Sequence, residues 1–178
     1  MKDNVLKWIV MTGTALCIYM ALHLHAGDSP KVGGRAPMVS GKNQNGTPWS
    51  LEQALTKSAV LLYFYPKDDT PGCTKQACGL RDRIGDLKKE GIQVIGVSRD
   101  TEASHRAFIS KFNLNFDLLA DVDGKITAAY GAEFPGRDTL SRRVSFLIRK
   151  DGTVAHVTDT MKAETHLEEM KDAAAKLK

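Results

Sequence analysis

Runs of apolar residues divide the chain into segments whose spacing indicates either a strand or a helix. Residues 59–65 form a continuous apolar run rich in strand-favouring residues and closed by Pro66, which indicates a strand buried on both faces. Residues 73–90 have a different spacing, with charged residues between apolar ones three and four positions apart. These apolar positions are Ala77, Leu80, Ile84 and Leu87. They predict an amphipathic helix that ends at Gly91.

The remaining segments continue the alternation of strands and helices. Strand patterns cover 92–98 and 116–120, and helix patterns cover 101–112, 125–130 and 163–177. In 101–112, the residues available for the inner face are Ala103, Ala107, Phe108 and Phe112. Hairpins are expected at 38–50 and at 144–157, where Asn43–Gly46 and Asp151-Gly152 supply the turns.

This order of elements predicts the fold class. Alternating strands and helices followed by an antiparallel hairpin indicate an α/β fold with a mixed central β-sheet, helices on both faces and an N-terminal β-hairpin at one edge. A cysteine, Cys73, directly follows the central strand and begins the next helix. That placement narrows the prediction to a thioredoxin-like fold.

The first residues have a different pattern from the rest of the chain. Lys2 and Lys7 accompany an apolar run at 8–24, and small or polar residues follow it. This layout predicts a signal peptide at 1–26 and an exported, periplasmic protein. If it stays uncut, the run could instead anchor the protein in a membrane. We expect residues 27–35 to form an exposed lead-in and 36–178 to form the single domain.

Composition excludes some classes of partner. The 178-residue chain has 42% hydrophobic and 26% charged residues, the proportions of one globular domain. Its formal charge is +4, with basic residues scattered among acidic ones. We therefore expect a mixed-charge surface and no nucleic acid as partner.

Removal of residues 1–26 would leave two cysteines, Cys73 and Cys78. In an exported protein such a pair is typical of a structural disulfide, because the compartment oxidises thiols. A non-catalytic exported domain with a structural disulfide is therefore one hypothesis. A metal site is not expected, because C-x₄-C lacks the usual zinc spacing and no second ligand pair follows.

The residues around Cys73 support a catalytic hypothesis instead. Free N–H groups and the helix dipole stabilise a thiolate in the first turn of a helix, and a thiolate can attack an O–O bond to leave a sulfenic acid. The Thr70 hydroxyl, three residues earlier, can point at the sulfur and at the peroxide oxygen. Pro66 ends the strand and can limit access of water to the sulfur.

The motif Pro66-x-x-x-Thr70-x-x-Cys73 resembles the active-site motif of the peroxiredoxins residue for residue, and Cys78 is similar to the second cysteine of their PrxQ/bacterioferritin comigratory protein subgroup. The resemblance runs from about residue 32 to the C-terminal helix. It implies a cofactor-free peroxidase that reduces hydrogen peroxide and organic hydroperoxides to water and alcohols. It also implies that Cys73 is peroxidatic, that Cys78 is resolving and that Thr70 positions the peroxide. A later arginine would hold the thiolate. Arg143 matches it, and Arg142 is the second choice.

Cysteines five positions apart in a helix lie about 140° apart around its axis and about 7.5 Å apart along it. A disulfide between Cys73 and Cys78 therefore requires the first helical turns to unwind, which Gly72 and Gly79 would make easier. Because both cysteines belong to one chain, we expect a monomer. Turnover requires an external dithiol, and the resemblance implies thioredoxin or a thioredoxin-like reductant.

Three further expectations are open to test. A thioredoxin-fold disulfide exchange protein is the other enzyme hypothesis, although it would favour C-x-x-C and would not need Thr70. His105, His156 and His166 have no predicted partners near the motif, so they are expected on the surface or in the core. Asp68 and Asp69 are expected to be solvated loop residues.

Overall fold

The structure is a computed structural model that describes residues 29–177. The predicted signal peptide, 1–26, and the alternative anchor, 8–24, lie outside the described residues. Among the described residues, no helix is both long enough and apolar enough to cross a membrane.

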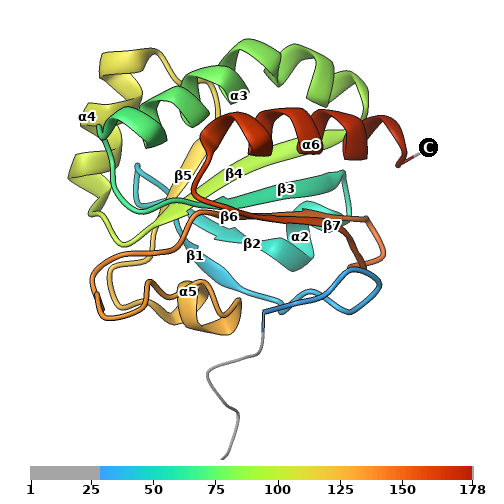
Figure 1. Cartoon of the computed structure of the whole chain (residues 1–178), viewed down its shortest axis with the longest axis horizontal. Coiled ribbons are helices and arrows are strands. Elements are labelled where there is room, and N and C mark those ends of the chain that lie inside the picture. The colour runs from blue at the N-terminus through green and yellow to red at the C-terminus, as the bar shows by residue number, and fades with distance from the viewer. Residues whose placement is uncertain (1–28, 178) are drawn as a thin grey trace, which may run out of the picture.

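The order of elements follows the predicted alternation (Figure 1). The strands are β1 (Ser40–Lys42), β2 (Pro48–Ser50), β3 (Ala59–Phe64), β4 (Ile92–Ser98), β5 (Asp117–Ala120), β6 (Val144–Ile148) and β7 (Val154–Asp159). The helices are α2 (Leu51–Leu55), α3 (Pro71–Lys89), α4 (Glu102–Phe112), α5 (Lys125–Ala129) and α6 (Ala163–Ala175).

The main sheet has five strands in the order β5-β4-β3-β6-β7. β3, β4 and β5 are parallel, whereas β6 runs antiparallel to β3 and β7 runs antiparallel to β6. β1 and β2 form a separate antiparallel hairpin. The predicted mixed sheet and N-terminal hairpin are confirmed.

Helices cover both faces of the sheet, also as predicted. α3 and α6 lie side by side on one face, and α2 and α5 lie on the other (Figure 1). All six residues of β3 are buried, with Leu61 and Tyr63 facing α3 and α6, and Leu62 and Phe64 in the opposite core. This two-sided burial explains why the strand reads as a continuous apolar run.

Two details of the helices differ from the prediction. The short helix α2 was missed, although Ser50 caps it by accepting a hydrogen bond from Gln53 N at 3.3 Å. In α4 the predicted inner face was wrong at Ala103 and Ala107, which are exposed, whereas His105 and Phe108 are buried. The helical period was right, but a polar residue occupies part of the buried face.

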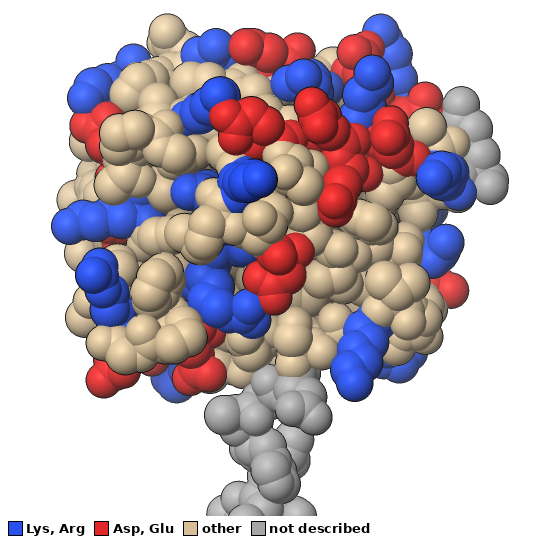
Figure 2. Space-filling view, viewed as in Figure 1, with Lys and Arg blue, Asp and Glu red and all other residues tan. Residues whose placement is uncertain are grey.

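Basic and acidic side chains are interspersed on the face shown in Figure 2. Among the described residues, the ion pair Lys75–Glu164 joins α3 to α6, and Arg142–Asp159 joins the segment before β6 to the end of β7. The exposed residues 31–35 run beside the start of β7, where Gly33 N donates to Val154 O at 2.9 Å.

Candidate active site

Cys73 lies at the end of the sheet where β3 finishes. The loop 65–70 leads from β3 into α3, and Pro71 occupies the first turn of the helix, where its fixed φ fits and its missing N–H costs nothing. Cys73 is therefore in the first turn, among backbone N–H groups that lack intrahelical partners. Its side chain is 2% exposed.

Arg143, directly before β6, brings a buried positive charge to this sulfur. Its Nη2 donates to Cys73 Sγ at 3.3 Å, and its Nη1 donates to Gln76 Oε1. A Cβ at Gly72 would lie 3.1 Å from the same Nη2, so the glycine leaves room for the guanidinium. The arrangement places a positive charge and a hydrogen-bond donor directly against the sulfur of Cys73.

Arg142, the second choice, points away from the sulfur. Its Nη1 donates to Asp159 Oδ2 at 2.6 Å and its Nη2 donates to Gly131 O at 2.7 Å. Neighbouring residues at the start of a strand point to opposite faces, which explains the difference. The structure therefore brings Arg143, rather than Arg142, to Cys73.

Gln76 was missed by the sequence reasoning. It is 1% exposed and lies three positions after Cys73, on the same face of α3. Within residues 29–177, its Nε2 and the Nε of Arg143 are buried without a hydrogen-bond partner. The helical spacing from Cys73 was the available signal, because it places a polar residue on the buried face.

Thr70 and Pro66 lie in the loop before α3. The Thr70 hydroxyl donates to Lys67 O at 3.1 Å and makes no capping bond to the helix. Its hydrogen is therefore directed to the loop in this conformation, while its oxygen can still accept a hydrogen bond. Pro66 is half-buried directly after Tyr65.

Cys78 lies in the second turn of α3 and is half-buried. Both Cys73 and Cys78 are free thiols, and the helix is continuous from Pro71 to Lys89. The helical geometry separates the two sulfurs as the sequence predicted. A disulfide between them is therefore incompatible with this conformation.

A model described as the AhpC/TSA family matches residues 32–157. The chain belongs to the AhpC/TSA family.

Two relatives with names show which members of the family this chain is similar to. The putative peroxiredoxin bcp of Coxiella burnetii is 40% identical over 80% of this chain and 97% of its own length. Peroxiredoxin Bcp of Escherichia coli K12 is 42% identical over 76% of this chain and 90% of its own.

Solved structures agree with the sequence relatives. Peroxidoxin BcpB of Mycobacterium tuberculosis matches with a TM-score of 0.79 at 27% identity, covering 84% of this chain and 99% of that one. Peroxiredoxin Q of Xanthomonas campestris matches with a TM-score of 0.72 at 29% identity, covering 79% and 92%. The predictions of a thioredoxin-like fold and of a thiol peroxidase similar to PrxQ and Bcp are confirmed.

Tyr63 is a further buried group near the sulfur of this thiol peroxidase. Burial raises the pKa of Tyr63 well above its ordinary value of 10.0, and negative charge at Cys73 raises it further. The phenol therefore stays protonated. Its hydroxyl has no hydrogen-bond partner among the described residues. A Cβ at Gly96 would lie 2.9 Å from this hydroxyl, so the glycine makes room for the ring.

Two predictions about polar residues near the motif were wrong. Asp68 was expected to be solvated but is 7% exposed, and His105 was expected to lack a partner near the motif but faces it, with Nδ1 2.9 Å from Asp68 Oδ2. Asp69 is exposed as predicted and pairs with Lys111 at 2.6 Å. Burial alone would raise the pKa of Asp68, but hydrogen bonds with His105, Ser104 and Tyr65 outweigh it and lower that pKa.

The other two histidines lie where the sequence predicted. His166 is in the core, where its Nε2 is 2.8 Å from Thr160 O and its Nδ1 is 2.7 Å from Ser145 Oγ. His156 is half-buried on β7, with Nε2 3.2 Å from Glu169 Oε2. Neither makes a hydrogen bond to Cys73 among those of the described residues.

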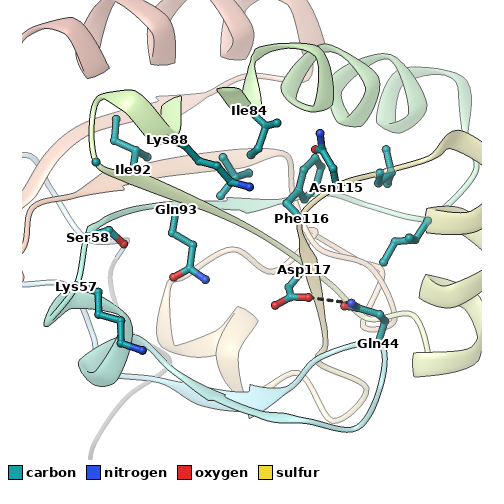
Figure 3. Close-up of a pocket in the computed structure, with 14 residues that line it drawn as sticks. Gln44, Lys57, Ser58, Ile84, Lys88, Ile92, Gln93, Asn115, Phe116 and Asp117 are labelled. Atoms are coloured by element: carbon teal, nitrogen blue, oxygen red, sulfur yellow. Dashed lines mark hydrogen bonds between the residues drawn. The ribbon is translucent and has the colours of Figure 1, made fainter. Parts of the chain in front are cut away.

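A surface pocket of about 600 Å³ lies at the opposite end of the sheet (Figure 3). Its lining includes Lys57 and Ser58 before β3, residues 92–94 at the start of β4, and Lys88 near the end of α3. On one side, Gln44 Nε2 donates to Asp117 Oδ1 at 2.8 Å. Because Cys73 lies where β3 ends, this pocket is separate from the candidate active site.

Proposed function

We propose that Cys73 is the peroxidatic cysteine of this enzyme, that Cys78 resolves its oxidised form, and that the substrates are hydrogen peroxide and organic hydroperoxides. The observation that carries the proposal is the 3.3 Å hydrogen bond from Arg143 Nη2 to a buried sulfur in the first turn of a helix. The guanidinium stabilises negative charge on sulfur before the reaction and on the peroxide oxygens during it.

In the first step the Cys73 thiolate attacks one peroxide oxygen and the O–O bond breaks. The leaving oxygen takes up a proton and departs as water or an alcohol, and Cys73 becomes a sulfenic acid. Thr70 supplies a hydroxyl that orients the peroxide, and Pro66 shields the sulfur from water. No cofactor or metal takes part in this step.

In the second step the Cys78 thiol gives up its proton and attacks Cys73 Sγ. The S–S bond forms as the S–O bond breaks, and the sulfenic hydroxyl takes up that proton and leaves as water. The intact helix keeps the two sulfurs apart, so its first turns must unwind between the steps. The contacts to be broken include Gln76 with Arg143 and Lys75 with Glu164. An external thioredoxin-like dithiol then reduces the disulfide by exchange.

Two substitutions test the assignments. Cys73→Ser should abolish peroxide consumption by the reduced protein, because serine cannot form the attacking thiolate. Cys78→Ser should allow one equivalent of peroxide to be consumed, and then hold Cys73 as a sulfenic acid or an intermolecular disulfide. Peroxide loss that survives Cys73→Ser would contradict the proposal. Mass spectrometry of the quenched protein distinguishes the states of Cys73.

A disulfide exchange protein and a domain with a structural disulfide are the alternatives. A static Cys73–Cys78 bond would require a conformation in which α3 does not begin at Pro71. An exchange protein would reduce disulfide substrates without consuming peroxide. The same reduced protein assayed against peroxide and against a disulfide substrate separates the three functions.

The compartment and the assembly complete the proposal. A signal peptide at 1–26 would export the enzyme to the periplasm, where only a thioredoxin-like protein of that compartment could reduce it. An anchor at 8–24 would hold it at the membrane. N-terminal sequencing of the protein from its native host, with the fraction it came from, decides between them. Sedimentation of the reduced protein tests the expectation of a monomer, which rests on both cysteines lying in one chain.

A further inference from the structure

We propose that the buried Asp68–His105 pair positions Thr70 for the peroxide step, without itself contacting the substrate. The inference rests on the proposed role of Cys73. It concerns two residues that lie outside α3 and that take no part in the chemistry described above.

The Asp68 carboxylate is held by three side chains. Its Oδ1 accepts from the Tyr65 hydroxyl at 2.7 Å, and its Oδ2 accepts from Ser104 Oγ at 2.7 Å and faces His105 Nδ1 at 2.9 Å. Ser104 and His105 belong to α4, and His105 is 0% exposed. The loop before α3 is therefore joined to α4 through one buried carboxylate.

The donors and acceptors around His105 define where its protons lie. Nε2 is 3.1 Å from Leu119 O, a carbonyl that can only accept, so Nε2 carries a hydrogen. Nδ1 faces the Asp68 carboxylate, so a second proton lies between these two groups. Burial alone would raise the pKa of Asp68, but hydrogen bonds with His105, Ser104 and Tyr65 lower it and favour the carboxylate form. Asp68 and His105 thus form a buried hydrogen-bonded pair, and removal of the carboxylate would leave the Nδ1 of His105 buried without this partner.

One peptide unit connects this pair with Thr70. Asp68 N donates to Asp100 Oδ2 at 2.9 Å, and the carbonyl in the same peptide unit, Lys67 O, accepts from the Thr70 hydroxyl at 3.1 Å. Because a peptide unit is planar, its carbonyl cannot turn without moving its N–H. Asp100 holds the N–H of this peptide unit and the buried carboxylate holds the side chain of the same residue, so together they fix the direction of the Thr70 hydroxyl.

The position of the pair in the chain limits its effect to one step. All the residues that hold Asp68 precede Pro71 or belong to other elements, so they keep their contacts when the first turns of α3 unwind. The pair therefore acts when peroxide meets Cys73, while the helix is intact. The intrinsic reactivity of the thiolate depends instead on Arg143 and the helix terminus.

The test compares two reactions of the same sulfur in Asp68→Asn. Peroxide requires a correctly placed Thr70, whereas iodoacetamide alkylates any accessible thiolate. We expect the second-order rate constant for hydrogen peroxide to fall roughly 10-fold or more, and the rate constant for iodoacetamide to stay within about two-fold of wild type. Stopped-flow mixing with the reduced protein gives the first constant, and mass spectrometry of alkylated Cys73 gives the second.

Asp69→Asn is the matched control. It makes the same chemical change one position along, at an exposed residue paired with Lys111, and asparagine tolerates the positive φ of 54° found there. Neither rate constant should change by more than about two-fold, because exposed ion pairs contribute little.

Ser104→Ala provides a second variant that removes only one hydrogen bond from Asp68. We expect its peroxide rate constant to fall roughly three-fold with alkylation unchanged, and this ratio decides the matter if Asp68→Asn fails to fold. If a folded variant keeps the wild-type ratio of the peroxide rate constant to the iodoacetamide rate constant, the positioning role would be overturned. This holds whether both constants stay the same or both fall equally. Peroxide loss by Cys73→Ser would instead overturn the proposed function itself.

Discussion

The two ends of helix α3 are held by different kinds of contact. In the first turns, Cys73 and Gln76 face a buried guanidinium, and two polar atoms there have no partner among the described residues. After Gly79 the inner face is apolar, formed by Leu80, Ile84 and Leu87 in the core beneath α6.

Because of this difference, one helix contributes both to the candidate active site and to the hydrophobic core. Burial of each large apolar side chain stabilises the fold by about 1.5–3 kcal/mol. A buried polar group that lacks a partner costs free energy instead. The second half of α3 therefore has the more strongly stabilising contacts, which is the difference that the proposed unwinding of the first turns requires.

The largest expected effect is on hydrogen exchange along α3. When the Cys73–Cys78 disulfide forms, backbone amides between Cys73 and Gly79 should exchange at least about 100-fold faster than in the reduced protein. Amides from Ile84 to Lys89 should change little, because their apolar contacts persist. Exchange followed by mass spectrometry measures both segments. Equal protection of the first turns in the two redox states would contradict the unwinding step.

The next effect concerns Arg143, whose guanidinium contacts the first turns of α3. Arg143→Lys should lower the second-order rate constant for peroxide by roughly 10- to 100-fold, because lysine cannot contact Cys73 and Gln76 together. Arg142→Lys is the control and should change the rate little, since Arg142 binds Asp159 and Gly131. A similar loss in both variants would show that the effect is not specific to the sulfur.

Two glycines test the packing of the helix by urea unfolding. A Cβ at Gly79 would lie 2.3 Å from Leu167 Cδ1, so Gly79→Ala should lower the free energy of unfolding by about 1–2 kcal/mol. A Cβ at Gly85 would have no other atom within 4 Å. Gly85→Ala should therefore raise the free energy of unfolding by about 0.5–1 kcal/mol, because alanine has the higher helix propensity. Stabilisation by both substitutions would mean that Leu167 moves aside freely.

The smallest expected effect is a dependence of the free energy of unfolding on pH, caused by the buried residue His166. Burial lowers the pKa of His166 from its ordinary value of 6.5, and the charge of Arg143 lowers it further. The unfolded chain therefore takes up the proton first, so stability falls as the pH drops below about 6.5. His166→Asn should flatten the dependence of the urea midpoint between pH 7 and pH 5. If the urea midpoint of this variant changes with pH as it does in the wild type, a group other than His166 causes the pH dependence.

Most elements were predictable because their signals are local. β4 lies at 92–98 as expected, and α3 begins two residues earlier than expected because Pro71 fits its first turn. α2 was missed because it is short, although the cap at Ser50 was a usable signal. Ala103 and Ala107 were assigned wrongly because an apolar pattern cannot show that a polar residue, His105, occupies the buried face of α4.

The order of strands and helices, and the motif around Cys73, could be recognised in the sequence because spacing and turn residues act over a few positions. Which distant groups meet became clear only in the folded chain, where Arg143 contacts Cys73 and Gln76, and His105 contacts Asp68. The physical reason is that hydrogen bonds and desolvation depend on distances set by the packing of the whole sheet and its helices. Thus Asp68, which looks like a solvated loop residue in the sequence, becomes the buried centre of a network in the fold.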